Sequence, residues 1–396
     1  MSSAERSLRR RAEVRRRSRR PRLGRVLMLT AALSLVMPVI SWVSYQFGQS
    51  GIPVSVATVE WMRDNGARGI VVHIEDWYYT LTAPSKGGPP LKRLPEQAGA
   101  VVAGQTVRKA ATRHASVPAY YEPPPLKPLI HPALPGEGVW RAPFHERGVK
   151  YSPVLITSYR SNPSYPQMVA GVAWIDHTQV DIQYYPGSEE PAVNIPNRGP
   201  EEVPPNLRYK LLATFNSGFK IADSGGGVVV NGVTYAPMVD GKATFVKYRN
   251  GRMNVISWTY GPKAPHDVLW ARQNLPLIVN NGKPNPNLSD GPQWGFTLGN
   301  AIEVWRSGLG IDKYGNLIYA AADYQTVASL AQILIHAGAV RAMQLDINAE
   351  WPSFITYTGP GAADPANLLS GMSQSPNRYL TPDIRDFYAV YLKSKP

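Results

Sequence analysis

The sequence predicts a mixed α/β domain, made mostly of antiparallel sheets with few helices, that lies outside the cytoplasm behind a single N-terminal transmembrane helix. Three observations lead to this prediction. A 22-residue stretch without charged side chains follows an arginine-rich start. Short β-branched and aromatic runs, separated by turn clusters, fill the second half of the chain. One amphipathic helix interrupts those runs near their end.

The composition excludes several classes of protein. The chain of 396 residues is 43% hydrophobic and 10% aromatic, which is enough to build a core and excludes global disorder. Because there is no cysteine, there is no disulfide, thiolate nucleophile or zinc–thiolate site. The seven histidines show no H-x-x-x-H or H-E-x-x-H pairing, the spacing typical of zinc hydrolases. No cofactor is therefore predicted, and a divalent metal such as calcium stays open as an alternative that no motif supports.

The N-terminus predicts membrane topology. Residues 1–25 contain eleven arginines and two glutamates, so they hold +9 of the net charge of +14. The other 371 residues carry +5, which is too dilute to predict a nucleic-acid partner. Residues 26–47 are long enough to span a bilayer as a helix, and aromatic side chains lie near their end. We therefore predict a basic cytoplasmic tail (1–25), a transmembrane signal anchor (26–47) and a single-pass cell-membrane protein.

A cleaved export signal is the competing interpretation of this N-terminus. Ser18-Arg19-Arg20 is similar to part of a twin-arginine signal. The apolar run is long for a signal peptide, however, and no clear small-x-small cleavage site follows it. These two features favour the anchor.

Two segments connect the predicted span to the main domain. Residues 48–82 form a small membrane-proximal unit, with a helix over Thr58–Asn65 and a β-branched, aromatic strand over Gly69–Leu81. Residues 83–133 are rich in proline and glycine, a composition that favours extended conformations. We interpret this second segment as a linker.

The main domain is predicted over residues 134–396. Its helix, Thr326–Ala337, places apolar side chains on one face and stops at Gly338. A strand over Val340–Leu345 follows at once and ends in Asp346. Asn-Gly pairs and a glycine cluster separate the other strands. These strands are predicted at Val154–Tyr159, Val169–Ile175, Val180–Tyr184, Tyr209–Phe215, Val228–Val230 and Val268–Trp270.

Four motifs in this order, within residues 134–388, resemble the phosphodiester glycosidase family. They are Leu134-Pro-Gly-Glu-Gly-Val-Trp140, Phe215-Asn-Ser-Gly-Phe219, Arg306-Ser-Gly-Leu-Gly310, and the helix followed by Leu345-Asp346. The chain departs from the family pattern twice. Lys220 stands where the family has a second aromatic residue, and Ile347-Asn-Ala-Glu-Trp351 stands where it has a Gly-Gly-Gly-Ser run.

The resemblance implies a membrane-anchored, extracytoplasmic hydrolase that cleaves a glycosyl phosphodiester, meaning a sugar-1-phosphate diester. Its partner would be a cell-envelope polysaccharide, or exopolysaccharide, or another glycoconjugate. Two alternatives stay open. One is a non-catalytic polysaccharide-binding or scaffolding protein on the same fold. The other is a phosphodiesterase that cuts the P–O bond, which generally needs a metal or several cations around phosphorus.

Carboxylates for this chemistry follow the strand that precedes Asp346. Asp346 is the first catalytic candidate, because strand ends in α/β sheets commonly line ligand crevices. Glu350 is the second, as acid or base. In an extended chain Asp346 and Glu350 would lie roughly 13 Å apart, too far for a retaining pair, whereas a turn would bring them together. The alternative is that Asp346 holds a turn and that Glu350 and Asn348 cap a loop.

The predicted substrate-binding residues carry amides, cations or flexible backbone. The Asn216 amide can donate to a sugar or phosphate oxygen, and Gly218 allows positive φ in the turn that follows. The Arg306 guanidinium suits bidentate phosphate binding. Each residue also has a purely structural alternative, such as an Asx-turn for Asn216 or an ion pair for Arg306. The full set is Asn216, Gly218, Arg306, Gly308, Asn348, Lys220 and Glu137, and the sequence leaves a metal requirement open.

Overall fold

The computed structural model describes most of the main domain and parts of the N-terminal region. Besides a few residues within 28–30 and 69–81, the described residues are 36–47, 53–67, 83–95, 121–143, 151–289, 291–295, 303–359 and 361–393.

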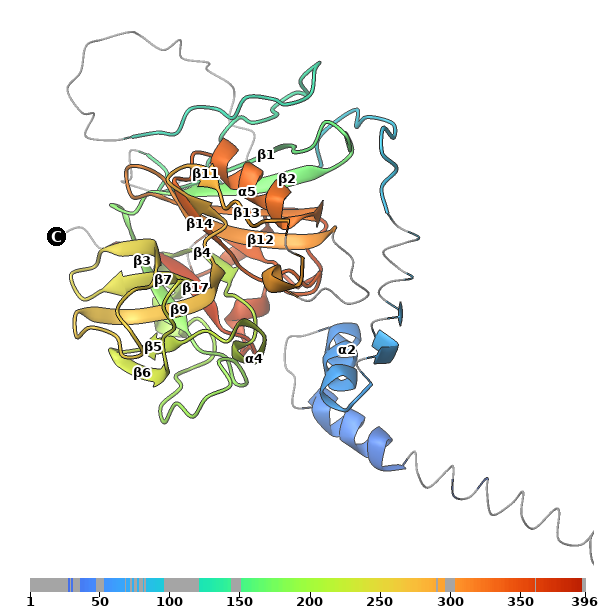
Figure 1. Cartoon of the computed structure of the whole chain (residues 1–396), viewed down its shortest axis with the longest axis vertical. Coiled ribbons are helices and arrows are strands. Elements are labelled where there is room, and N and C mark those ends of the chain that lie inside the picture. The colour runs from blue at the N-terminus through green and yellow to red at the C-terminus, as the bar shows by residue number, and fades with distance from the viewer. Residues whose placement is uncertain are drawn as a thin grey trace, which may run out of the picture.

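The first of three sheets in the domain has seven strands (Figure 1). They are β1 (Val154–Arg160), β2 (Val169–Ile175), β10 (Val279–Asn280), β11 (Lys283–Pro284), β12 (Val304–Ile311), β13 (Leu317–Gln325) and β14 (Arg341–Gln344). Their order across the sheet is β1-β2-β13-β12-β14-β10-β11, and the neighbouring strands are antiparallel.

The other two sheets have five strands each, again in antiparallel pairs. The second sheet contains β3 (Val180–Tyr185), β4 (Leu211–Asn216), β15 (Phe354–Gly359), β16 (Ala363–Asn367) and β17 (Phe387–Leu392), in the order β16-β15-β4-β17-β3. The third contains β5 (Val228–Val230), β6 (Val233–Ala236), β7 (Lys242–Tyr248), β8 (Met253–Ser257) and β9 (Val268–Pro276), in the order β6-β5-β9-β7-β8.

The predicted class, mostly antiparallel sheets with few helices, is confirmed for this domain. Each predicted strand is present, although the segment from 209 first completes a 3-10 helix and becomes a strand only at Leu211. The described helical segments of the domain are short apart from α5. They are η1 (Pro205–Lys210), α4 (Ile221–Ser224), η2 (Gly291–Trp294), α5 (Val327–His336) and η4 (Arg378–Leu380).

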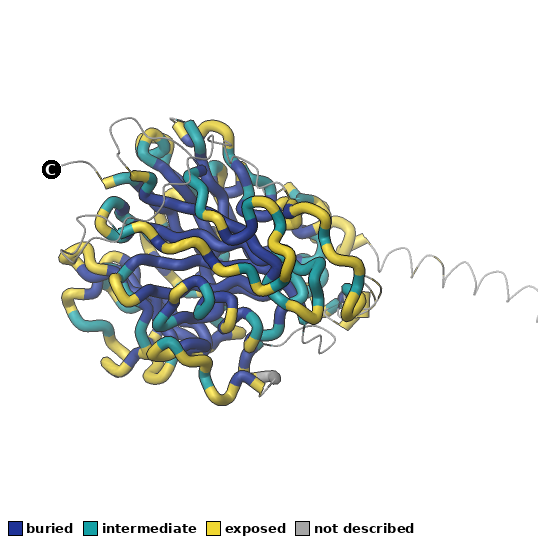
Figure 2. The backbone as a smooth tube through the Cα atoms, turned by 90° about the horizontal axis from the view of Figure 1, so that it is seen from above, coloured by how far each residue is buried: buried dark blue, intermediate teal, exposed yellow. Residues whose placement is uncertain are grey.

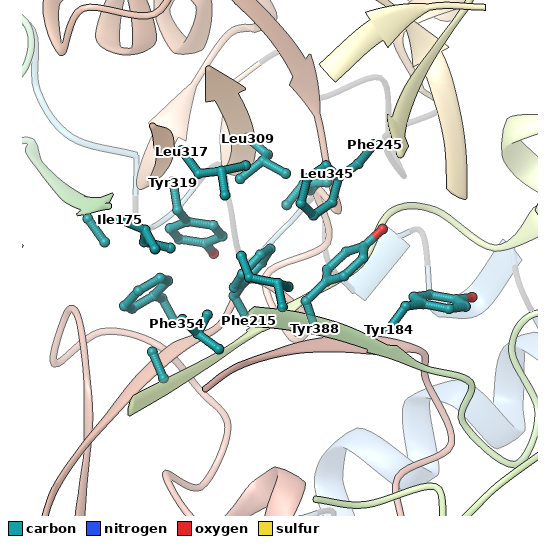
Figure 3. Packing of buried hydrophobic residues seen from close by; sticks show 14 of the residues in the cluster. Ile175, Tyr184, Phe215, Phe245, Leu309, Leu317, Tyr319, Leu345, Phe354 and Tyr388 are labelled. Carbon is teal, nitrogen blue, oxygen red and sulfur yellow. The ribbon is translucent and has the colours of Figure 1, made fainter. Parts of the chain in front are cut away.

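An aromatic cluster joins the first two sheets and fixes the residues that follow it. The Phe215 ring contacts those of Tyr319, Phe354 and Tyr388, and Tyr319 contacts Phe354, with ring centroids between 5.0 and 6.0 Å apart (Figure 3). Leu345 belongs to the same buried cluster. Burying Phe215 and Leu345 therefore places Asn216 and Asp346, the next residue after each, at the edge of one core. Figure 2 shows the burial of each residue along the backbone, with buried segments inside the domain and exposed segments around them.

Helix α5 covers the first sheet, and its approach explains a glycine in β12. The Thr326 side chain caps the helix by accepting a hydrogen bond from the Ser329 N–H, and Leu330 and Leu334 are fully buried beneath it. A Cβ atom at Gly308 would lie 2.8 Å from Cδ1 of Leu334. Glycine at this position therefore serves close packing of a helix on a strand.

The N-terminal region differs from its prediction in one segment. The predicted helix is present as α2 (Val54–Asp64). The strand predicted over Gly69–Leu81 is wrong, because every described residue of this segment is helical. β-branched and aromatic residues favour a strand only where a pleated surface packs against neighbours, and no described strand pairs with this segment.

The predicted spanning segment lies partly outside the described residues. Its described part, residues 36–47, is helical and meets α2, where Trp42 Nε1 donates to Thr58 Oγ1 at 3.0 Å. The basic tail, residues 1–25, lies outside them altogether. Among the residues that the structure describes, no helix has both the length and the apolar character needed to cross a bilayer.

The end of the predicted linker packs against the domain. Leu126 is buried in the cluster beneath α5, and its N–H donates to the Gly138 carbonyl at 2.9 Å. The Lys127 carbonyl pairs with His336 Nε2 at 2.8 Å. Residues 121–133 are therefore attached to the domain, while residues 96–120 lie outside the described part of the chain.

Candidate functional site

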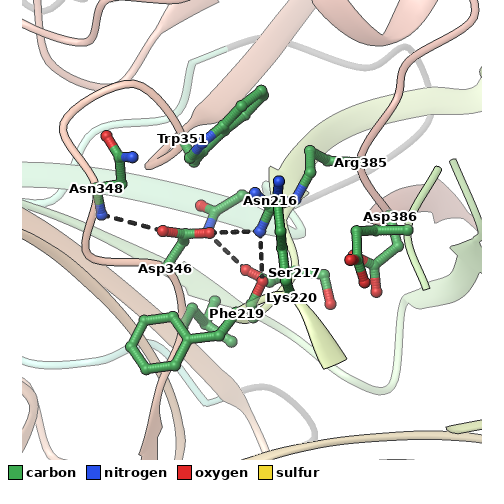
Figure 4. Close-up of polar contacts among 12 residues, drawn as sticks. Asn216, Ser217, Phe219, Lys220, Asp346, Asn348, Trp351, Arg385 and Asp386 are labelled. Carbon is green, nitrogen blue, oxygen red and sulfur yellow. Dashed lines mark hydrogen bonds and ion pairs between the residues drawn. The ribbon is translucent and has the colours of Figure 1, made fainter. Parts of the chain in front are cut away.

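Asp346 lies just beyond β14, with both its backbone and its carboxylate held in place. Ser307 of the neighbouring β12 donates to the Asp346 carbonyl from its N–H (3.0 Å) and from its hydroxyl (2.8 Å). The carboxylate accepts from the Asn348 N–H at 3.0 Å and from Arg385 Nη2 at 2.7 Å (Figure 4). Asp346 is only 4% exposed. The predicted catalytic carboxylate is thus buried and fixed rather than free on a loop.

Arg385 connects the three loops that meet here. It precedes β17, and its Nη2 also donates to the Gly218 carbonyl at 3.1 Å. Its guanidinium lies against the Trp351 ring, 4.8 Å from the ring centroid. The turn after β4, the loop after β14 and the segment before β17 therefore converge on one arginine. The sequence interpretation did not include this residue.

The buried pair sets the charge of the site. Burial raises the pKa of Asp346, and the charge of Arg385 opposes that rise. Burial would lower the pKa of Arg385, but Asp346 and other nearby carboxylates outweigh it and raise that pKa. The guanidinium is therefore a permanent cation beside a carboxyl group whose ionisation depends on it.

Asn216, at the end of β4, connects the sheets. Its Oδ1 accepts from the Tyr319 hydroxyl at 2.9 Å and from the Ser353 N–H at 3.0 Å. Its Nδ2 donates to the Ser217 carbonyl at 2.8 Å and to Ser307 Oγ at 3.1 Å. The Asn216 side chain makes four hydrogen bonds within the protein, so it stabilises the residues around the site.

Gly218 is required for close approach, not for the positive φ that the sequence interpretation expected. Its φ lies outside the left-handed region. A Cβ atom here would lie 2.9 Å from Nδ2 of Asn274, which itself donates to the Gln344 carbonyl at 2.7 Å. Asn274 thereby connects the turn after β4 to the end of β14.

The chain turns after Asp346 instead of staying extended. Asn348 Oδ1 accepts from the Glu350 N–H at 3.2 Å, and the Trp351 N–H donates to the Asn348 carbonyl at 2.9 Å. Asn348 therefore contacts Asp346 through its backbone and shapes the loop through its side chain. Glu350 stays beside this loop, and its Oε2 lies 3.8 Å from Arg63 Nη1 of helix α2.

Lys220 lies in the turn after β4 and faces helix α2. Its Nζ is 2.9 Å from Glu60 Oε2 and 3.7 Å from Asp64 Oδ1. Figure 4 shows Lys220 beside Asn216 and Arg385. The residue that replaces the family's second aromatic is thus a cation at the edge of the site.

Two residues predicted to bind substrate, Arg306 and Gly308, make their contacts on the other face of the first sheet. Arg306 donates to the Gln325 carbonyl at 2.7 Å and to Gln344 Oε1 at 2.9 Å. Burial lowers its pKa to about 10. Because side chains alternate along a strand, Arg306 points away from the face on which Ser307 contacts Asp346. Gly308 packs under α5, as described above. The structure therefore does not bring the Arg306 guanidinium to the Asp346 carboxylate.

Glu137 lies far from this site and clamps Arg160. Its Oε1 accepts from the N–H and Nε of Arg160, both at 2.9 Å, and its Oε2 accepts from Arg160 Nη2 at 2.8 Å. Arg160 ends β1, which is four strand positions from β14 in the sheet. At about 4.8 Å per position, β1 and β14 are roughly 19 Å apart. The structure thus places Glu137 in a buried ion pair outside the site.

A second buried ion pair, between Arg272 and Asp386, stabilises the residue that follows Arg385 in the chain. Arg272 Nε donates to Asp386 Oδ2 at 2.8 Å, and the Tyr184 hydroxyl donates to the same oxygen at 2.7 Å. Arg272 Nη2 also holds the Phe219 carbonyl at 2.7 Å. One feature of the sequence could have indicated that Arg385 and Asp386 lie at the site. Arg385-Asp386 directly precede an apolar strand, just as Asp346 directly follows one.

Within the described part of the chain, no group of three or more histidine, aspartate or glutamate side chains is arranged to hold a metal ion.

Comparisons with known proteins give one family and several distant structures. The family model described as phosphodiester glycosidase matches residues 209–346. No curated protein sequence matches the chain.

Three solved structures are among those similar to the chain. One is the catalytic domain of zebrafish N-acetylglucosamine-1-phosphodiester alpha-N-acetylglucosaminidase, auto-inhibited by pro-peptide, with 14% identity, 64% of this chain and 87% of that chain covered, and a TM-score of 0.39. A hypothetical protein from Synechocystis has 12% identity, coverage of 61% and 62%, and a TM-score of 0.37. A putative exported protein from Burkholderia pseudomallei has 11% identity, coverage of 59% and 75%, and a TM-score of 0.28.

Proposed function

Because this chain belongs, over residues 209–346, to the phosphodiester glycosidase family, we propose that it is a hydrolase that cleaves a glycosyl phosphodiester. The observation that supports this most directly is the buried ion pair at the end of the matched segment. Its last residue, Asp346, is the buried carboxylate that pairs with Arg385 at 2.7 Å. A carboxyl group beside a fixed cation is suited to a reaction at a carbon that bears a phosphate leaving group.

The proposed reaction breaks the bond between the anomeric carbon and the bridging phosphate oxygen. That oxygen leaves with the bonding electrons as part of a phosphate monoester. The hydroxyl of a water molecule ends on the anomeric carbon, and one proton is released. Because phosphate is a stable anion, its departure needs less help from an acid than an alkoxide would.

The side chains around Asp346 take distinct roles in this proposal. Asp346 acts at the anomeric carbon as the base or nucleophile. Arg385 offsets the negative charge of the phosphate, a role that the sequence interpretation assigned to Arg306. Glu350, in the same loop, is the second carboxylate. Asn216 positions the site through its four internal hydrogen bonds.

An isotope experiment tests this function against its two alternatives. The purified full-length chain is incubated with a sugar-1-phosphate diester in ¹⁸O water, and both products are examined by mass spectrometry. We expect free sugar that carries the label, as C–O cleavage requires. Label in the phosphate product would instead establish the phosphodiesterase, and binding of envelope polysaccharide without any product would establish the scaffolding protein.

We also propose that the domain acts outside the cytoplasm, anchored by residues 26–47. The support is the 22-residue uncharged run that directly follows the net charge of +9 in residues 1–25. Alkaline phosphatase fused after residue 396 is expected to be active in cells, because this reporter matures only outside the cytoplasm. An inactive fusion that is present at normal abundance would contradict the proposed orientation.

A further inference from the structure

Helix α2 inserts a buried carboxylate beside the candidate site. Glu60 is only 2% exposed. It belongs to the short helix α2, which precedes residues 209–346, the segment that the family model matches, and packs on the domain. Its Oε2 lies 2.9 Å from Lys220 Nζ, and its Oε1 lies 2.5 Å from Arg63 Nη1. Figure 1 shows α2 next to α4, the helix that begins directly after Lys220. This buried glutamate is therefore held by one cation of the domain, Lys220, and by one of its own helix, Arg63.

The charges around Glu60 favour its ionised form. Burial by itself would raise its pKa, but Lys220, Arg63 and Arg385 outweigh burial and lower that pKa to about 2. In turn Glu60 raises the pKa of Lys220 against the effect of burial. Its negative charge also contributes to the raised pKa of Asp346, so the carboxylate lies within electrostatic range of the proposed catalytic group.

Arg385 has donor capacity that its protein partners do not use. Its Nη2 bonds the Asp346 carboxylate and the Gly218 carbonyl. Among the described residues, no hydrogen-bond partner reaches its buried Nε. An arginine that is 6% exposed and retains an unused donor is costly unless another acceptor binds it at some stage of function.

We propose that Lys220 and Arg385 form the binding site for the anionic phosphate of the substrate, and that the Glu60 carboxylate of α2 occupies this site when substrate is absent. The inference rests on the proposed function, because it takes the ligand to be a phosphodiester. A carboxylate and a phosphodiester each carry one negative charge and two equivalent terminal oxygens. One can therefore replace the other without changing the net charge of the site.

Substrate binding then requires Glu60 to leave, which means that α2 moves. The other described contacts of the helix with the domain include one apolar cluster and two ion pairs. Val56 packs in a small buried cluster with Trp351 and Ile384, Asp64 lies 3.7 Å from Lys220, and Arg63 lies 3.8 Å from Glu350. Trp351 and Glu350 belong to the loop after Asp346, so movement of α2 uncovers that loop together with the anion site.

Binding of dimethyl phosphate, a phosphodiester monoanion, tests the site without any turnover. It is titrated into the purified full-length chain by calorimetry. Glu60→Gln is expected to lower the Kd at least tenfold, because it removes the competing charge. Glu122→Gln, which neutralises an exposed glutamate, is the matched control and should leave the Kd unchanged. Adding Lys220→Met to Glu60→Gln should remove the gain, and adding Lys220→Arg should keep it.

Hydrogen exchange provides a second readout that does not depend on any variant folding. Dimethyl phosphate at saturation should speed amide exchange in residues 54–64 of the wild-type chain. The proposal is overturned if Glu60→Gln leaves the Kd unchanged, if its gain survives Lys220→Met, or if bound dimethyl phosphate leaves exchange in α2 unaltered. If dimethyl phosphate binds as expected but neither the wild-type chain nor any variant releases sugar from a sugar-1-phosphate diester, the proposed function is contradicted and the anion site is retained.

Discussion

Asp346→Asn is expected to lower kcat for release of sugar from a sugar-1-phosphate diester about a thousandfold or more, while KM changes far less. The substitution keeps the size of the side chain and an oxygen that can accept from Arg385. It removes the negative charge and the basicity that a base or nucleophile needs at the anomeric carbon, and such groups typically contribute factors of about a hundred to ten thousand.

The control for this prediction is Asp267→Asn, which makes the same chemical change at an exposed aspartate before β9. It should leave the rate unchanged. Thermal unfolding of both variants separates loss of chemistry from loss of structure, because Asp346 also neutralises the buried Arg385. A folded Asp346→Asn protein that releases sugar at the wild-type rate would remove Asp346 from the mechanism.

Asp386→Asn is expected to lower the free energy of unfolding by about 3–5 kcal/mol, the usual cost of leaving one partner of a buried ion pair uncompensated. Arg272 and Asp386 are 1% and 2% exposed. Without the carboxylate, the Arg272 charge stays in the core, and the Tyr184 hydroxyl loses its 2.7 Å acceptor. Urea unfolding measures the change. A loss below about 1 kcal/mol would show that the pair contributes little.

The same pair predicts how stability depends on pH. Burial would raise the pKa of Asp386, but Arg272 and the hydrogen bonds from Arg272 and Tyr184 outweigh it and lower that pKa. Because the native pKa is the lower one, the stabilisation is complete at neutral pH and is lost as the pH falls below about 4. Asp386→Asn should flatten this part of the stability curve, whereas Asp267→Asn should leave its slope unchanged.

The loss of structure should reach the candidate site as well. Arg272 holds the Phe219 carbonyl at 2.7 Å, and the Ser217 N–H donates to the Asp386 carbonyl at 3.2 Å. The turn after β4 is therefore fixed by the ion pair directly behind Arg385. This connection explains why a pair with no contact to Asp346 belongs to the architecture of the site.

Local sequence patterns predicted seven strands and the main helix of the domain, for a simple reason. Strands and the α5 helix are stabilised by side chains that repeat with the period of the element, and that repeat is visible in the sequence. The segment over Gly69–Leu81 shows the limit. Its β-branched residues favoured a strand, but a strand needs a partner, and its described residues are helical.

The candidate site was predictable only in part. Asp346 was found because it ends an apolar strand that had to be buried, and Asn216 for the same reason after Phe215. Arg306 stays a predicted phosphate ligand, but the structure brings Arg385, which the sequence did not indicate, to the Asp346 carboxylate. The face on which a strand residue lies depends on the sheet that packs against it. Glu137 fitted a motif, yet its partner Arg160 lies 23 residues further along the chain.

The sequence by itself determined the class of fold, the positions of seven strands and of helix α5, and the two residues at which buried strands give way to polar side chains. Only the tertiary structure decided which cation meets Asp346 and which carboxylate meets Lys220. Arg385 is 39 residues from Asp346, and Lys220 is 160 residues from its partner in α2. Charge pairs of this kind are selected by three-dimensional packing and shared burial, and neither has a period that a sequence displays.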